Sequence, residues 1–385
     1  MSGPLTVSSG PSRLGVRAAL VDGVVVEGDV VVGDGRVIEV GVAPAGGSGL
    51  AVPGFVDLHI NGIVGVDFLS TDVEGYRVAG VALAATGVTA YLPTFITSPM
   101  GDYPDALAVA GEALAADGAP GARVLGVHLE GPYLSPLWPG AHDPEQLRTP
   151  DTAEALALCD AGPVRMVTLA PELDGGLDLV EALAARGVVV SLGHTDADAH
   201  TAGAAFDRGA RAITHLYNAH RRWTARDPGV GGAALIRPGV TVQAIVDHVH
   251  LAPEAAYAAF LTARERFSLV TDAMEAAGQG DGVYRLGRRE VSVHGARAEL
   301  SDGLLAGSVL TMDAAVRNLH ACGATLAESV WAATGAPARL LGDPELGVLR
   351  VGARADIAVL DDDLHVVRTL VEGAEQFAAS SQPAA

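Results

Sequence analysis

Lysine is absent from this 385-residue chain, so all 25 of its basic residues are arginines. A chain without lysine cannot form a Schiff base through a lysine amine, bind nucleotide phosphates with a P-loop lysine or anchor a pyridoxal cofactor. A carbamylated lysine that bridges two metal ions is excluded for the same reason. The absence of one residue type therefore removes several classes of covalent and nucleotide chemistry.

Cysteine is almost as scarce, since only Cys159 and Cys322 occur and they lie far apart. This spacing favours two small core residues over a metal-binding or redox pair, and it implies no disulfide framework. The chain also lacks an apolar run of about 18 residues and a basic-then-apolar leader. We therefore expect a soluble, cytoplasmic protein with no membrane partner.

Positive charge is in short supply as well, because the formal net charge is −21 at pH 7. Such a chain repels nucleic acids and anionic membranes, so we expect no nucleic-acid partner. An anionic substrate would need a local cluster of arginines. The densest basic segment contains His220, Arg221, Arg222 and Arg226. Arginine can bind phosphate there through paired hydrogen bonds, although a solvated loop explains the same residues equally well.

Apolar runs alternate with helical stretches through most of the chain. Runs of this kind are typical of buried parallel strands, and strands that alternate with helices indicate a (β/α)8 TIM-type barrel in the α/β class. The expected helices cover residues 79–85, 103–116, 153–159, 177–186, 199–208, 253–262, 311–322 and 326–334. The eight expected strands cover residues 52–59, 88–93, 124–129, 165–169, 188–192, 212–216, 240–246 and 267–271.

The two ends of the chain show a different pattern. Asp22-Gly23 and Asp34-Gly35 interrupt short β-rich runs and are typical of hairpin turns. Residues 347–352 and 355–360 are again β-like. We therefore expect a small β-sandwich domain formed by residues 1–51 and 346–385, and a barrel domain formed by residues 52–345.

Potential metal ligands follow three of the predicted strands. Glu130, His194 and His215 each stand where a different strand ends. The carboxyl ends of parallel strands meet at one rim of a barrel, so these side chains can converge. A catalytic metal site usually takes three protein ligands and keeps one position open. A single histidine at a strand end is more often structural, but three ligands on three strands favour a metal site.

Two further strand ends carry polar residues. Asp272 could take a proton from a metal-activated water and return it to a leaving group, but this residue alone could equally cap a helix. His59-Ile60-Asn61 ends the first barrel strand, where a second histidine in place of Asn61 would indicate a second metal ion. Because asparagine is a poor ligand for transition metals, His59 is only a weak candidate ligand, and we expect one ion instead of two.

Taken together, several motifs resemble the N-acetylglucosamine-6-phosphate deacetylase family of the amidohydrolase superfamily. The resemblance covers about residues 16–372, and the motifs are specific in their combination and order. They are Pro53-Gly54-Phe55-Val56-Asp57-Leu58-His59, His128-Leu129-Glu130-Gly131-Pro132, Leu192-Gly193-His194-Thr195, Thr214-His215-Leu216-Tyr217-Asn218-Ala219, Arg226-Asp227-Pro228-Gly229, Leu269-Val270-Thr271-Asp272-Ala273 and Arg354-Ala355-Asp356-Ile357-Ala358.

The resemblance implies a homodimer with Zn²⁺ or a similar divalent ion on Glu130, His194 and His215. It implies that Asp272 is the catalytic acid and base, and that Arg226 binds phosphate, in some members from the neighbouring subunit. The remaining substrate-binding positions that it implies are Ala141, Asn218, Ala219, His250, Leu305, Ala306 and Gly307.

The expected function is hydrolysis of N-acetyl-D-glucosamine 6-phosphate to D-glucosamine 6-phosphate and acetate. Three alternatives stay open: deacetylation of the galacto epimer, hydrolysis of another amide on the same scaffold, such as an aminoacylase-like reaction, and a sugar-phosphate sensor without catalysis. His220-Arg221 replaces a more apolar stretch of the family, so the epimer and the phosphate contacts are undetermined at this point.

Overall fold

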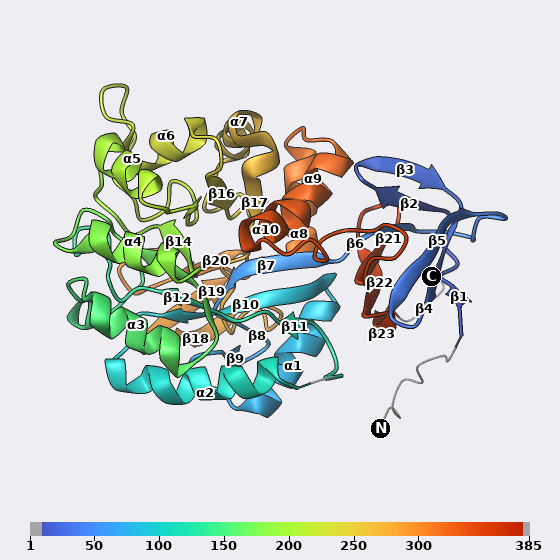
Figure 1. Cartoon of the computed structure of the whole chain (residues 1–385), viewed down its shortest axis with the longest axis horizontal. Helices are drawn as coiled ribbons and strands as arrows, with labels where there is room; N and C mark the ends of the chain where they lie inside the picture. Colours follow the sequence, from blue (N-terminus) through green and yellow to red (C-terminus); the bar gives the residue numbers. More distant parts are fainter. Residues whose placement is uncertain (1–9, 117, 380–385) are drawn as a thin grey trace.

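Eight parallel strands form the barrel that the sequence predicts, as the computed structural model of residues 10–116 and 118–379 shows (Figure 1). Neighbouring strands pair in chain order, and the ring closes where Ile60 pairs with Ala273. The strands are β7 (Phe55–Ile60), β10 (Val88–Ile96), β12 (Val127–Glu130), β13 (Val164–Leu169), β14 (Val189–Leu192), β15 (Ala212–Ile213), β16 (Thr241–Ala244) and β17 (Phe267–Leu269).

Helices cover the outside of the barrel, which explains why its strands are apolar on both faces. Several helices begin at an aspartate whose side chain accepts a backbone N–H of the first turn, as Asp72, Asp151 and Asp198 do. The helices are α1 (Val73–Ala84), α2 (Tyr103–Leu114), α3 (Thr152–Ala161), α4 (Gly176–Ala185), α5 (Ala199–Asp207), α6 (Gly229–Ile236), α7 (Pro253–Ala263), α8 (Met312–Ala321), α9 (Leu326–Ala333) and α10 (Gly335–Leu341).

Two predictions about the barrel need correction. The strand expected at residues 212–216 ends at Ile213, because the backbone turns to positive φ at His215 and Tyr217. Helix α6 was not predicted, since three of its eight residues are glycines, which are poor helix formers. Gly232 in α6 is needed for packing, because a Cβ atom there would lie 2.3 Å from Pro228 and 3.1 Å from Trp223.

The chain ends meet in two sheets beside the barrel (Figure 1). A six-stranded sheet joins both ends in the order β23-β22-β21-β6-β2-β3, and a three-stranded sheet has the order β1-β4-β5. Their apolar faces share a second core that includes Val30, Val37, Ile357 and Val359. The strands are β1 (Ser12–Arg13), β2 (Ala18–Val21), β3 (Val24–Glu27), β4 (Asp29–Gly33), β5 (Arg36–Val42), β6 (Leu50–Pro53), β21 (Ile357–Leu360), β22 (Val366–Val371) and β23 (Ala374–Ala378).

The predicted hairpin turns are confirmed, since β2 pairs with β3 across Asp22-Gly23 and β4 with β5 across Asp34-Gly35. The β-like interpretation of residues 347–352 is wrong, because this stretch is a loop with positive φ at Gly347 and Gly352. The exact domain boundaries, at residues 51/52 and 345/346, stay a prediction.

An antiparallel sheet that was not predicted contacts the carboxyl-end rim of the barrel. It consists of β18 (Gly282–Leu286), β19 (Arg289–His294) and β20 (Arg297–Glu299), and it shares an apolar cluster with Ile96 and Ala141. Three short elements, β8 (Gly62–Ile63), β9 (Val66–Asp67) and β11 (Arg123–Val124), complete the strands among the described residues. None of the described helices has the length and apolarity needed to span a bilayer.

Candidate metal centre and active-site cavity

Glu130, His194 and His215 converge at the carboxyl-end rim of the barrel, as their strand-end positions predict. Glu130 is the last residue of β12, while His194 and His215 each follow a strand by two residues. Their ligand atoms all lie within 4.8 Å of one another, and all three side chains are buried. The Nε2 atom of His194 lies 3.2 Å from Oε1 of Glu130, and that of His215 lies 2.9 Å from the same oxygen.

The hydrogen bonds of both histidines show that this cluster suits a cation. The Nδ1 atoms lie 3.0 Å and 3.2 Å from the carbonyl oxygens of Trp138 and Asn218, respectively. A carbonyl only accepts, so each Nδ1 carries the proton and each Nε2 keeps its lone pair. The two Nε2 atoms nevertheless lie 3.1 Å apart, beside a carboxylate oxygen. Three acceptors that face each other repel unless a positive ion lies among them, so the donor set fits a divalent metal ion.

The second carboxylate oxygen of Glu130 is also held in place. Its Oε2 lies 3.3 Å from Nε2 of His142 and 3.4 Å from Nε2 of His59. Since Nδ1 of His142 accepts the backbone N–H of Thr97, the ring proton is on Nε2 and points to Glu130. Burial lowers the pKa of His142 to about 4, helped by nearby His194, so the ring stays neutral at pH 7. Burial acts to raise the pKa of Glu130, but His59 and the other histidines lower it well below its usual range.

Asp272 lies next to this cluster and faces the cavity. Its Oδ1 accepts a hydrogen bond of 2.7 Å from Nδ2 of Asn61 and lies 3.2 Å from Nε2 of His59. Burial acts to raise the pKa of Asp272, but the nearby His59 outweighs burial and lowers it. Burial likewise acts to lower the pKa of His59, but the carboxylates of Glu130 and Asp272 raise it well above its usual value. The Asp272 carboxylate is therefore ionised and able to accept a proton.

Unusual backbone conformations accompany the same residues. His194, His215 and Asp272 have φ values of 49°, 29° and 48°, and Ala219 has 51°. Positive φ is uncommon outside glycine and concentrates where a fold holds functional groups in strained positions. The strain here turns the side chains at three strand ends toward one point.

A cavity of about 530 Å³ opens above the cluster, which is within the range of small-molecule sites. Glu130, His194, His215 and Asp272 are part of its lining. Of the predicted substrate-binding positions, the ones that line it are Ala141, Asn218, Ala219, His250, Leu305 and Gly307.

Three predicted site residues do not line this cavity. His59 is fully buried beneath it, and Ala306 is buried in the apolar cluster with Met274. Arg226 is exposed outside it. The structure therefore brings the predicted metal ligands and Asp272 together but leaves the predicted phosphate-binding arginine apart from them in a single chain.

Sequence analysis missed His142, which lines the cavity, and it noted His220 and Arg222 only as members of the basic segment. His142 lies in an irregular loop after β12, and no strand-end signal marks it. His220 and Arg222 belong to the basic segment that the sequence analysis identified. The sequence did not show which side chains of this segment point to the cavity.

A parallel barrel with a carboxylate and two imidazoles converging at its carboxyl-end rim defines a metal-dependent barrel hydrolase. Residues 50–382 match the Amidohydrolase family, and the chain belongs to this family. The resemblance noted from the motifs is thereby confirmed.

Individual relatives match most of the chain. The N-acetylglucosamine-6-phosphate deacetylase of Homo sapiens is 41% identical over 344 residues, which cover 85% of this chain and 83% of the relative. The N-acetylgalactosamine-6-phosphate deacetylase of Escherichia coli O157:H7 is 39% identical over 328 residues, which cover 84% and 87%. A solved N-acetyl-D-glucosamine-6-phosphate deacetylase variant from Mycobacterium smegmatis, in complex with N-acetyl-D-glucosamine-6-phosphate, superimposes with a TM-score of 0.89 at 36% identity, covering 96% of this chain and 99% of that chain.

Proposed function

We propose that the chain is a metal-dependent deacetylase that hydrolyses N-acetyl-D-glucosamine 6-phosphate to D-glucosamine 6-phosphate and acetate. The observation that carries this proposal is the convergence of three lone-pair donors, from Glu130, His194 and His215, beside an ionised Asp272 in one cavity. The names of the relatives with 36–41% identity support the substrate class.

Glu130 Oε1, His194 Nε2 and His215 Nε2 would hold the ion. A divalent ion in this position polarises an amide carbonyl and promotes the ionisation of water. Asp272 takes the proton of the attacking water on its carboxylate, and a new C–O bond forms at the acetyl carbon. Asp272 then delivers that proton to the amide nitrogen as the C–N bond breaks, which yields acetate and the free amine. The bond from Asn61 holds the Asp272 carboxylate in place.

The remaining lining residues bind the sugar. Nδ1 of His250 lies 2.7 Å from Oδ2 of Asp247, which fixes the ring and leaves Nε2 available to the cavity. With its proton on Nδ1, the ring accepts a hydrogen bond from a sugar hydroxyl at Nε2. Asn218, Ala219, Leu305 and Gly307 line the same cavity.

One Zn²⁺ per subunit is the cofactor that we propose. Two imidazoles and a carboxylate are a common catalytic zinc set. A second ion is disfavoured because Asn61 donates a hydrogen bond to Asp272 instead of acting as a ligand, and His59 already lies between the two carboxylates.

Deacetylation of N-acetylgalactosamine 6-phosphate is the second candidate function, favoured by the relative from Escherichia coli O157:H7. Acetate release from both epimers, from N-acetylglucosamine and from an N-acetyl amino acid tests these functions side by side. We expect the phosphorylated gluco epimer to react fastest. Faster turnover of the galacto epimer would make N-acetylgalactosamine 6-phosphate the substrate. Faster turnover of the N-acetyl amino acid would indicate an aminoacylase-like enzyme. Tight binding of a phosphorylated sugar without turnover would indicate a sensor.

Two further expectations stay predictions. Homodimerisation predicts a mass of about twice 39.0 kDa in solution, which light scattering measures. Localisation in the cytoplasm is checked by cell fractionation.

A further inference from the structure

We propose that Arg222 binds the phosphate group of the substrate within its own chain. This inference rests on the proposed function and assigns the part of the cavity that recognises phosphate. It adds a second arginine to the sequence-based expectation, which gave this role to Arg226, in some members from the neighbouring subunit.

Arg222 is the one arginine among the described residues that line the cavity. Of the acidic residues of the same lining, Glu130 belongs to the metal cluster and Asp272 lies next to it. In a chain with a net charge of −21, a phosphate group would meet repulsion almost everywhere else. A guanidinium at the cavity wall offers the paired hydrogen bonds that match phosphate oxygens.

The guanidinium of Arg222 is also available for a ligand. Within residues 10–116 and 118–379 it forms no hydrogen bond or ion pair with another side chain. Beside it, His220 lines the same cavity and is buried, and neither of its ring nitrogens has a hydrogen-bond partner of good geometry in the described part of the chain.

Arg221, between these two residues, has a different role. Its Nε lies 2.6 Å from Oδ2 of Asp227, and its NH1 lies 3.0 Å from Oδ2 of Asp196. Both partners neutralise its charge and turn it away from the cavity. Successive side chains of an extended segment point to opposite sides, so anchoring Arg221 to the protein directs His220 and Arg222 to the cavity.

The loop around Arg222 is fixed on its other side too. The ring of Trp223 packs edge-on against Tyr217, with 6.2 Å between centroids, and the backbones of Thr224 and Asp227 pair with each other. Arg222 therefore projects from a backbone that is held at both neighbours. A pre-positioned cation of this kind loses less freedom on binding than one on a loose loop.

The test compares the variants Arg222→Ala, Arg226→Ala and Arg237→Ala by kcat and KM for N-acetylglucosamine 6-phosphate and N-acetylglucosamine. We expect Arg222→Ala to raise KM for the phosphorylated sugar about 10- to 100-fold, as loss of charge-assisted hydrogen bonds does, with little change for the neutral sugar. Arg222→Lys keeps the charge without the planar fork and should fall between wild type and Arg222→Ala.

Arg237→Ala is the matched control, because it removes one arginine charge outside the cavity, where Arg237 pairs with Asp207. It should leave the preference for the phosphorylated sugar unchanged. The inference is overturned if Arg222→Ala keeps the wild-type preference for the phosphorylated sugar, whatever Arg226→Ala does.

Calorimetry with glucosamine 6-phosphate and glucosamine separates failure of this inference from failure of the proposed function. If the wild type releases no acetate but Arg222→Ala still weakens binding of the phosphorylated amine, the proposed reaction is wrong and the phosphate site stands. If the wild type releases acetate and Arg222→Ala binds the phosphorylated amine as tightly as wild type, the proposed reaction stands and the assignment of Arg222 is wrong.

Discussion

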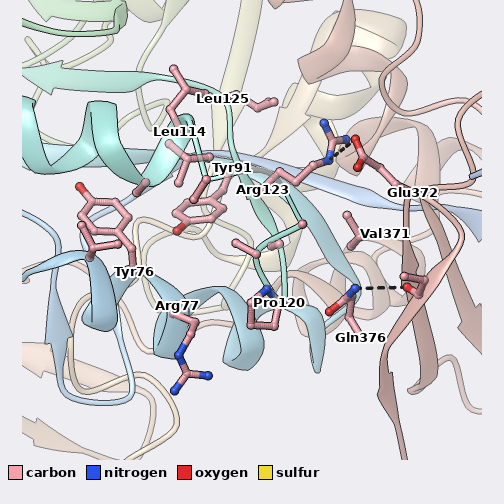
Figure 2. Close-up of a pocket in the computed structure, with 18 of the residues that line it drawn as sticks. Tyr76, Arg77, Tyr91, Leu114, Pro120, Arg123, Leu125, Val371, Glu372 and Gln376 are labelled. Atoms are coloured by element: carbon pink, nitrogen blue, oxygen red, sulfur yellow. Dashed lines mark hydrogen bonds and ion pairs between the residues drawn. The ribbon is translucent and has the colours of Figure 1, made fainter. Parts of the chain in front are cut away.

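Two large cavities among the described residues differ in character, and the larger of the two is not the one with the chemistry. A hollow of about 1040 Å³ lies beside helices α1 and α2 and strands β22 and β23, against about 530 Å³ at the carboxyl-end rim. Figure 2 shows the larger one, with Tyr76, Tyr91, Arg123, Glu372 and Gln376 among its labelled residues.

The two cavities differ in how their charges are matched. In the larger one, Arg77 pairs with Glu74, and Arg123 pairs with Asp356. Arg123 also lies 3.8 Å from Glu372 (Figure 2). At the rim, acceptors face acceptors around Glu130, and Arg222 has no partner among the described side chains. Charges that are paired contribute to the fold, whereas acceptors that face one another without a donor indicate a missing cation. Volume alone does not distinguish the two.

The largest effect that we expect comes from the metal ligands. Glu130→Gln removes the negative charge that the two Nε2 atoms share, and His215→Ala removes a ligand outright. Both variants should lose bound metal and reduce turnover by several orders of magnitude, because nothing else activates water. Metal content and acetate release measure this effect. A variant with full turnover would show that the rim cavity does not depend on these ligands for activity.

Asp272→Asn should have the next largest effect. The amide cannot accept a proton, so kcat should fall about 10²- to 10⁴-fold, the usual contribution of general acid–base catalysis. The metal content and the melting temperature should stay near those of the wild type. Asn61→Ala, which only removes a donor to Asp272, is the graded comparison and should cost less. Near wild-type turnover in Asp272→Asn would show that another group moves the proton.

Acid should destabilise the metal-free protein through its buried neutral histidines. The pKa of His142 is about 4 in the folded state and 6.5 in the reference state, so the unfolded chain takes up the proton first. Its contribution is complete above pH 6.5 and is lost as the pH falls toward 4, by about 3 kcal/mol in all. His142→Asn should flatten the dependence of the free energy of unfolding on pH in this window. An unchanged slope by denaturant titration would contradict the neutral ring.

The smallest effect on turnover should come from the larger cavity. Arg123→Ala leaves the buried Asp356 with Arg354 as its remaining partner, so the free energy of unfolding should drop by about 1–3 kcal/mol. The values of kcat and KM should stay within about twofold, because Arg123 does not line the cavity at the carboxyl-end rim. Arg77→Ala, which breaks an exposed pair, is the control and should have little effect on stability. A strong loss of turnover in Arg123→Ala would mean that the larger cavity takes part in activity.

The parts of the site that could be predicted from the sequence are those tied to strand periodicity. Glu130, His194 and His215 follow apolar runs, and barrel geometry requires such positions to meet. The hairpins at Asp22 and Asp34 could be predicted because their turn residues tolerate positive φ.

The other parts depend on contacts that no local pattern encodes. Helix α6 forms against glycine propensity because Gly232 allows close packing on Pro228 and Trp223. His142 reaches Glu130 only through the path of a loop, and the face of Arg222 is decided by the ion pairs of Arg221 with distant Asp196 and with Asp227. Contacts between residues far apart in the chain cannot be predicted from local sequence patterns.

Metal analysis of the purified protein, combined with turnover before and after chelation, tests the central claim most directly. The account predicts one divalent ion per subunit in the wild type, no ion and no acetate release after chelation, and recovery of both when Zn²⁺ is restored. An exhaustively chelated protein that still released acetate at the wild-type rate would contradict it.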